Sequence, residues 1–151
     1  MLWDYYFIKM AELVASKSKD RSTKGGAVIV GPDNEVRSTG YNGFPRGVND
    51  NVEERHERPI KYSFVEHAER NAIYNAARVG IPIKGCTMYF NFEPYPCTEC
   101  AKAIIQSGII RLIGSNIPFP GVGEQWKKDW EISQIMLNEA GVEIIKLEEN
   151  Q

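Results

Sequence analysis

Apolar side chains recur along the chain at two spacings, one typical of helices and the other of strands. Residues 3–14 repeat them every three or four positions, which predicts an opening amphipathic helix. Its apolar positions are Trp3, Phe7, Met10, Ala11 and Val14. The segments 26–30 (GAVIV) and 35–41 (EVRSTGY) predict a β-hairpin, because the intervening GPDN supplies turn residues. A polar, irregular segment follows over 42–61.

Helices and strands then alternate through the rest of the chain. The pattern predicts a helix over 66–79, a strand over 87–92, a helix over 98–107, a strand over 109–113, a helix over 124–140 and a strand over 142–147. Strand–helix–strand order favours a sheet that is at least partly parallel and is covered by helices on both faces. We therefore expect a three-layer α/β/α sandwich with a central, mostly five-stranded mixed sheet, in a single domain over 1–151.

Charge and composition narrow the classes of partner. The 151 residues carry a formal net charge of −2, with a sequence pI near 5.8. This balance removes the diffuse positive field on which non-specific nucleic-acid binding depends, so no nucleic-acid partner is expected. Asp4, Lys9 and Glu12 interrupt the apolar N-terminus, and no later stretch approaches the run of about eighteen apolar residues that spans a membrane. We therefore expect no membrane association and a cytoplasmic location.

The cysteines indicate metal binding rather than a disulfide framework. There are three, Cys86, Cys97 and Cys100, and an odd number without a secreted context favours reduced thiols or metal ligands. Cys97 and Cys100 are three positions apart, so they share one face if they open the helix predicted over 98–107. Pro96 stands where a chain enters a helix. Cys86 precedes a strand, where a buried, free cysteine is ordinary.

A histidine supplies the third ligand of this expected site. His67 begins its own predicted helix, and both strand–helix junctions fall at the same end of a parallel sheet, where open α/β sheets bind their ligands. One histidine and two cysteines make three zinc ligands, the number typical of a catalytic zinc that keeps a position open for water. Such a zinc acidifies its water into a nucleophile near neutral pH.

A carboxylate stands two residues after the histidine. Glu69 can take a proton from that water and pass it to a leaving group, so it is the candidate acid/base. Two neighbouring carboxylates do not match this role. Glu66 is expected to cap its helix or to interact with the helix dipole, and Glu99 is expected to turn away from the face shared by the cysteines.

Two motifs in this order carry a family resemblance. His67-Ala68-Glu69 followed by Pro96-Cys97-Thr98-Glu99-Cys100 resembles the zinc-dependent cytidine and deoxycytidylate deaminase superfamily. The segments 38–47 (STGYNGFPRG), 67–73 (HAERNAI) and 100–109 (CAKAIIQSGI) resemble the deoxycytidylate (dCMP) deaminases in particular. The resemblance spans most of 1–147, and it implies a cytidine deaminase-like fold.

The resemblance implies an activity and roles for named residues. It implies hydrolysis of dCMP to dUMP and ammonia, which supplies dUMP for thymidylate synthesis. In that case His67, Cys97 and Cys100 bind one zinc ion and Glu69 shuttles protons. The residues expected to contact the substrate are Asn42 at the sugar, Ala68 beside the metal ligand and Phe119 stacked on the base.

The resemblance also implies regulation and assembly. Gly40, Tyr41, Asn42 and Gly43 match a segment associated in this family with an allosteric nucleotide site, activated by dCTP and inhibited by dTTP. Mg²⁺ is a possible companion of the triphosphate. A homo-oligomer, as a hexamer, is implied as well.

A nucleotide substrate needs a phosphate clamp. The loop 19–24 offers three cations and two hydroxyls, and Arg21, Ser22 and Lys24 are its candidate members. The alternative, an exposed polar loop, stays open because charge runs in loops are usually solvated.

Other readings also remain open. His56 is expected to be a surface or packing residue, and Trp126 and Trp130 are expected to form the buried stripe of the last helix. A deaminase of cytidine, guanine or tRNA adenosine would share the zinc chemistry. A non-catalytic, zinc-stabilised module that senses nucleotides is the alternative from another class.

Overall fold

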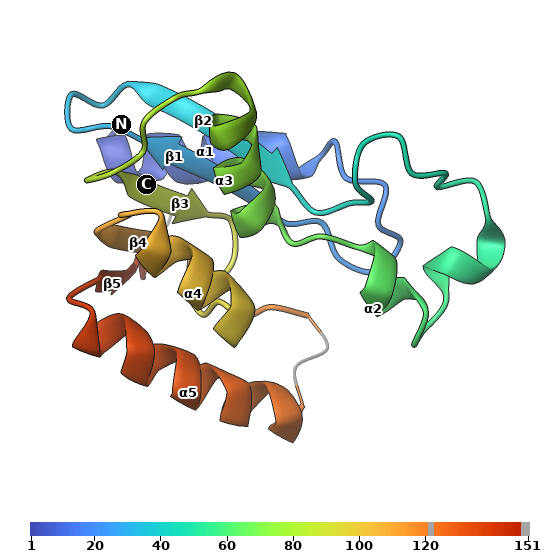
Figure 1. Cartoon of the computed structure of the whole chain (residues 1–151). Helices are drawn as coiled ribbons and strands as arrows, with labels where there is room; N and C mark the ends of the chain where they lie inside the picture. Colours follow the sequence, from blue (N-terminus) through green and yellow to red (C-terminus); the bar gives the residue numbers. More distant parts are fainter. Residues whose placement is uncertain (121–122, 149–151) are drawn as a thin grey trace.

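A five-stranded mixed sheet forms the centre of the computed structural model, which describes residues 1–120 and 123–148 (Figure 1). Its strands are β1 (Gly26–Val30), β2 (Val36–Tyr41), β3 (Thr87–Phe90), β4 (Arg111–Gly114) and β5 (Glu143–Lys146). They lie in the order β2-β1-β3-β4-β5. β1 pairs antiparallel with β2 and β3, whereas β3, β4 and β5 are parallel. The predicted mixed sheet of five strands is confirmed.

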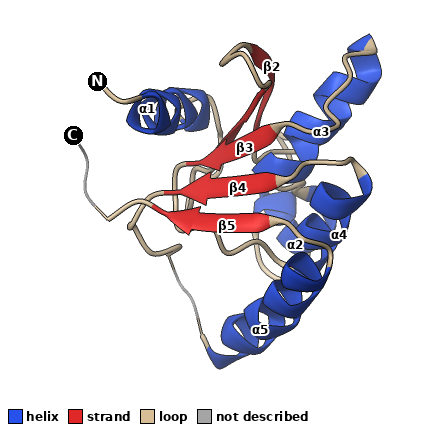
Figure 2. Ribbon diagram, turned by 90° about the vertical axis from the view of Figure 1, so that its left-hand side faces the viewer, coloured by secondary structure: helices blue, strands red, loops and turns tan. Residues whose placement is uncertain are grey.

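Helices cover both faces of the sheet, as the alternation of elements predicted. They are α1 (Trp3–Ala15), α2 (Lys61–Phe64), α3 (Ala68–Val79), α4 (Thr98–Gln106) and α5 (Glu124–Glu139), with a short 3₁₀ helix η1 at Glu53–His56. Figure 2 shows α1 on one side of the sheet and α3, α4 and α5 on the other. The three layers of the α/β/α sandwich are therefore unequal. None of the described helices is long and apolar enough to cross a membrane.

The core divides into one cluster on each face of the sheet. Val28 and Val30 of β1 pack toward α1 with Phe7, whereas Ala27 and Ile29 belong to the cluster beneath α3. Successive side chains of a strand point to opposite faces, so a strand covered on both faces reads as an unbroken apolar run. This explains why all five residues of β1 are buried.

The structure differs from the sequence-based expectation at some element ends. The segment 42–61, predicted as irregular, contains η1 and the first residue of α2. α3 begins at Ala68, two residues later than predicted, and β3 ends at Phe90, two residues earlier. Trp3 belongs to the predicted apolar stripe of α1 but is 56% exposed, because it lies outside the buried face of that helix and stacks on Phe7.

Close packing between β2 and α3 accounts for Gly40. A Cβ at this position would overlap the main-chain nitrogen of Ala72 and would lie 2.7 Å from the carbonyl oxygen of Ala68. The glycine therefore lets the strand approach the backbone of the helix that begins next to His67.

The Gly40→Ala substitution is expected to lower the free energy of unfolding by about 1–3 kcal/mol, because the added methyl forces the strand and helix apart. Chemical denaturation followed by circular dichroism measures this change. Gly43→Ala is the matched control, since its Cβ would have a nearest neighbour 3.9 Å away. Equal stability of the two variants would contradict the packing explanation.

Candidate active site

Two helix N-termini meet beyond the C-terminal end of the central strand β3. His67 is the N-cap residue of α3, and Cys97 is the N-cap residue of α4. The Sγ atom of Cys97 accepts the main-chain N–H of Cys100 at 3.4 Å, which places both sulfurs in the first turn of α4. Because helix N-termini carry partial positive charge, this junction favours thiolates and other anions.

The three predicted ligand atoms converge at this junction. The Nδ1 atom of His67 lies 3.4 Å from the Sγ of Cys97 and 3.3 Å from the Sγ of Cys100. Zinc binds sulfur at about 2.3 Å and imidazole nitrogen at about 2.0–2.1 Å, so tetrahedral ligand atoms lie roughly 3.5–4 Å apart. Within 1–120 and 123–148, this is the one group of three or more potential ligands found close enough to hold a metal ion. The donor set and its spacing fit zinc.

The thiols of this group are inequivalent without a metal. The hydrogen bond with Cys100 is the largest cause that lowers the pKa of Cys97, to about 4, and contact with His67 lowers it further despite burial. Its hydrogen bond to Cys97, together with burial, raises the pKa of Cys100 well above the ordinary value. One negative charge is therefore concentrated on Cys97.

Glu69 lies in the first turn of α3, beside this group. Its side chain is almost fully buried, with 6% of the residue exposed, and burial raises the pKa of the carboxyl group. A carboxyl group whose pKa is raised toward neutral pH can both accept and donate a proton, as a proton carrier must.

The two neighbouring carboxylates lie as expected. Glu66 accepts the main-chain N–H of His67 at 3.1 Å and forms an ion pair with Arg70. Glu99 is exposed and forms an ion pair with Lys102 at 2.8 Å, away from the sulfurs. Glu69 alone of these three glutamates lines the cavity described next.

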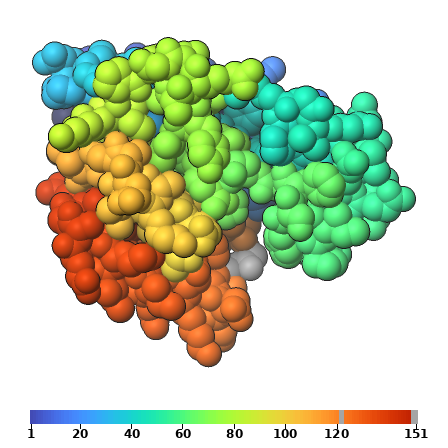
Figure 3. Space-filling model, in the orientation of Figure 1, coloured from blue at the N-terminus to red at the C-terminus, as the bar shows by residue number. Residues whose placement is uncertain are grey.

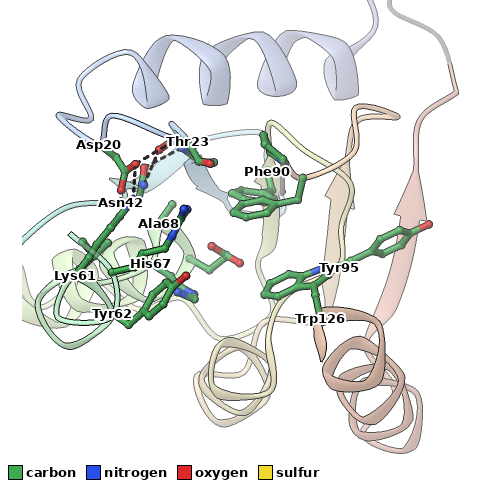
Figure 4. Close-up of a pocket in the computed structure, with 16 residues that line it drawn as sticks. Asp20, Thr23, Asn42, Lys61, Tyr62, His67, Ala68, Phe90, Tyr95 and Trp126 are labelled. Atoms are coloured by element: carbon green, nitrogen blue, oxygen red, sulfur yellow. Dashed lines mark hydrogen bonds and ion pairs between the residues drawn. The ribbon is translucent and has the colours of Figure 1, made fainter. Parts of the chain in front are cut away.

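A cavity of about 290 Å³ opens beside the metal-ligand group, between α2 and α5. In the space-filling view the surface is hollowed between the green segment around α2 and the orange start of α5 (Figure 3). Figure 4 shows the wall residues, among them the expected metal ligand His67 and its neighbour Ala68. Glu69 lines the same cavity. Asn42 and Phe119, also predicted as substrate contacts, line the same cavity.

Asn42 connects the end of β2 to the loop before β1. Its Oδ1 accepts the main-chain N–H of Gly25 at 2.8 Å, and its Nδ2 donates to the carbonyl of Thr23 at 2.9 Å. An asparagine amide can form four hydrogen bonds, so one acceptor site and one donor remain for a ligand.

The predicted phosphate clamp lies outside the cavity wall. Arg21, Ser22 and Lys24 are exposed, and Arg21 forms an exposed ion pair with Glu53. From the same loop, Asp20, Thr23 and Gly25 line the cavity instead.

Sequence reasoning missed the two cations on the wall. They are Arg58 and Lys61, which come from the stretch just before His67. No local pattern in the sequence distinguishes them from exposed cations, because both reach the wall through the packing of the segment before α3.

An aromatic pair forms another part of the wall. Phe119 stacks on Trp126 with ring centroids 5.4 Å apart and an angle of 13° between the planes. The expectation that Trp126 belongs to the buried stripe of the last helix is wrong, because its ring lines the cavity at the start of α5. Trp130 does pack against the core, and it also stacks on Tyr95 at 4.4 Å.

The segment Gly40–Gly43 is joined to the start of α3. Gly43 and Glu66 exchange two main-chain hydrogen bonds, of 3.1 and 2.8 Å. Tyr41 is 42% exposed, and Gly40 is buried. The segment proposed from the resemblance as an allosteric site therefore contacts the residue before the histidine ligand.

The remaining cysteine and histidine lie where they were expected. Cys86 is fully buried in the core cluster beneath α3. His56 is half-buried, stacks on Phe44 at 5.0 Å, and lies with its Nε2 2.6 Å from the carbonyl oxygen of Asp50. His56 is thus a packing residue.

The protein has a mixed sheet between helical layers, and a His-Cys-Cys group and a buried glutamate lie where two helices begin. These features define the class of zinc-dependent hydrolases in which three protein ligands hold the metal and water takes the fourth coordination position. The chain belongs to the cytidine and deoxycytidylate deaminase family. The family model described as "Cytidine and deoxycytidylate deaminase zinc-binding region" matches residues 1–115. This match and the His-Cys-Cys group together support Zn²⁺ as the metal.

Relatives and solved structures agree with this assignment. The chain is 42% identical over 146 residues to a protein of Aliivibrio fischeri named "uncharacterized deaminase in luxG 3′ region", covering 94% of this chain and 91% of that protein. It is 42% identical over 116 residues to the deoxycytidylate deaminase of Homo sapiens, covering 74% of this chain and 63% of that protein. The crystal structure of dCMP deaminase from the cyanophage S-TIM5 in complex with dCMP and dUMP matches with a TM-score of 0.73 and 27% identity, over 94% of each chain. The predicted cytidine deaminase-like fold is confirmed.

After zinc is removed with a chelator, iodoacetamide is expected to alkylate Cys97 at a rate that hardly changes between about pH 5.5 and 7.5. A group with a pKa of about 4 is already a thiolate throughout this range, whereas the alkylation rate of an ordinary thiol, with a pKa near 8.5, rises about tenfold per pH unit. Mass spectrometry of the digested protein measures the rate at each cysteine. Free glutathione alkylated under the same conditions is the control thiol, and a tenfold rise per unit at Cys97 would contradict the lowered pKa.

Proposed function

We propose that this protein is a deoxycytidylate deaminase, which hydrolyses dCMP to dUMP and ammonia. The observation that carries the proposal is the convergence of His67, Cys97 and Cys100. His67 and buried Glu69 also line one cavity. The names of the human relative and of the cyanophage structure support dCMP as the substrate. The chain spans 63% of the length of that human relative.

The residues of the site have distinct parts in this reaction. His67, Cys97 and Cys100 would hold zinc, which when bound lowers the pKa of a water molecule so that it can attack near neutral pH. Glu69 would take a proton from the attacking water and deliver protons to N3 of the pyrimidine and to the departing amine. Burial raises the pKa of the Glu69 carboxyl group, which makes its protonated form more accessible than in water and so favours this shuttle.

We infer substrate contacts from the cavity wall and from the loop before β1. Asn42 keeps one donor and one acceptor for the sugar, Ala68 lies beside the histidine ligand, and Phe119 offers a ring face to the base. That Arg21, Ser22 and Lys24 clamp the phosphate stays a prediction, supported by the composition of the loop.

Regulation and assembly belong to the same proposal. We infer that Gly40, Tyr41, Asn42 and Gly43 form a site where dCTP, with Mg²⁺, activates and dTTP inhibits. The contact between Gly43 and Glu66 supports it, since a nucleotide bound there would act next to His67. We further propose that the protein is a cytoplasmic homo-oligomer, a hexamer, that supplies dUMP for thymidylate synthesis.

Replacing Glu69 with Gln is expected to reduce dCMP turnover by about 10²–10⁴-fold while zinc stays bound, because the amide cannot carry a proton. Spectrophotometric assay of dCMP loss and elemental analysis of zinc measure the two effects. Glu99→Gln is the control, since Glu99 is exposed and faces away from the metal group. Full turnover by Glu69→Gln would contradict the acid/base role of Glu69, whereas zinc-loaded wild-type protein without dCMP turnover would favour a non-catalytic module that senses nucleotides.

A substrate panel tests the base, the sugar and the regulation together. We expect dCMP to be deaminated faster than CMP, deoxycytidine, dCTP, guanine or a cytosine-containing oligonucleotide. Adding dCTP with Mg²⁺ should lower the KM for dCMP, and dTTP should raise it. Faster turnover of another compound would reassign the substrate, and no response to either triphosphate would remove the regulatory part alone.

A further inference from the structure

A buried ion pair forms the part of the cavity wall that lies away from Trp126 and Tyr95 (Figure 4). Lys61 Nζ lies 3.0 Å from Asp20 Oδ1, and the two side chains are 12% and 5% exposed. Both residues line the cavity. A similar pair nearby, Lys19 with Asp50, has side chains that are 77% and 30% exposed and lies outside the cavity wall. Burial at the cavity therefore distinguishes the Asp20–Lys61 pair.

Main-chain groups hold Asp20 in place independently of the lysine. Its Oδ1 atom accepts the N–H groups of Ser22 at 2.8 Å and Thr23 at 3.0 Å. A carboxylate with these partners stays satisfied in a turn of the backbone. Asp20 is thus held by the main chain, and it positions the ammonium group of Lys61 at this end of the cavity.

The ammonium group of Lys61 retains capacity for a ligand. It has three N–H donors, of which one is directed to Asp20, and the hydroxyl of Ser22 lies 3.4 Å away. A lysine held in this way loses less side-chain entropy on binding than one that is free in solvent. A buried ammonium group with an unused donor on a cavity wall is a site for an anionic group.

The position of the pair matches one end of a nucleotide. In Figure 4, Asp20, Thr23, Asn42 and Lys61 lie on one side of His67, whereas Trp126 and Tyr95 lie on the other. With the pyrimidine at the metal group and the sugar at Asn42, as the proposed function requires, the 5′ substituent of the sugar extends toward Asp20 and Lys61.

Resting on the proposed function, we propose that Lys61, positioned by Asp20, is a specificity-determining residue that binds the 5′-phosphate and selects the nucleoside monophosphate over the uncharged nucleoside. The Asp20–Lys61 pair itself carries no net charge until the phosphate arrives.

Lys61→Met is expected to lower kcat/KM for dCMP by about 10- to 100-fold, the range for the loss of a hydrogen bond between charged groups. The change should appear in KM rather than kcat, and kcat/KM for deoxycytidine should stay nearly unchanged. Lys19→Met is the matched control, which removes an exposed lysine from an aspartate pair and should leave both substrates unaffected. The ratio of the two substrates, measured on one preparation, is independent of the fraction of folded protein.

A double variant separates binding from repulsion. Lys61→Met leaves the Asp20 carboxylate uncompensated, and its charge alone could weaken phosphate binding. Asp20→Asn with Lys61→Met restores the neutral charge of the pair without the ammonium group. Persistent loss of dCMP selectivity in the double variant supports direct binding by Lys61, and recovery of selectivity would overturn it.

The wild-type protein separates this proposal from the proposed function. If it does not prefer dCMP to deoxycytidine, the assigned substrate is wrong whatever Lys61 does. If it prefers dCMP and Lys61→Met keeps that preference, the role of Lys61 alone fails. Where deoxycytidine turnover is too slow to follow, the ratio of inhibition constants for dUMP and deoxyuridine gives the same readout.

Discussion

The convergence of two sulfurs on one imidazole nitrogen, at 3.4 and 3.3 Å, is the constraint on which the rest of the site depends. It requires α3 and α4 to begin side by side on one face of the sheet, and the parallel pairing of β3 with β4 through α4 provides this. Both helices then direct the positive ends of their dipoles at the same point. The fold thus concentrates positive potential where thiolates and an attacking water need it.

Two asparagines at the ends of strands hold the loop before β1 in a fixed position relative to the sheet. Asn42 at the end of β2 bonds to Thr23 and Gly25, while Asn91 just after β3 accepts the N–H of Gly26 at 2.9 Å and donates to the carbonyl of Lys24 at 3.1 Å. The loop is therefore held from two strands that both end at the metal-ligand group. This bracing explains how a polar loop can present a buried carboxylate to the cavity with a fixed geometry.

The chemistry near the metal could be predicted from the sequence because it is local. His67 and Glu69 lie at the start of one helix, and Cys97 and Cys100 lie at the start of another, where their spacing of three places both cysteines on one face. Lys61 and Trp126 could not be found in this way, since each reaches the cavity only through tertiary packing of a segment whose local pattern is polar or helical. For the same reason Trp126 was misread as a core residue.

Local placement of charge, and not net charge, determines how this protein can accept an anion. The chain as a whole is acidic, with a net charge of −2, and a distant field of that sign would slightly repel a nucleotide. At physiological salt, charges more than about 8 Å apart in solvent are largely screened, so groups on the cavity wall dominate. Of the wall's ionised groups, Arg58 has no anionic partner among the described ion pairs, whereas Lys61 is balanced by Asp20. A phosphate at this end therefore meets one positioned ammonium group and one further cation, and the surrounding acidic surface has little influence on it.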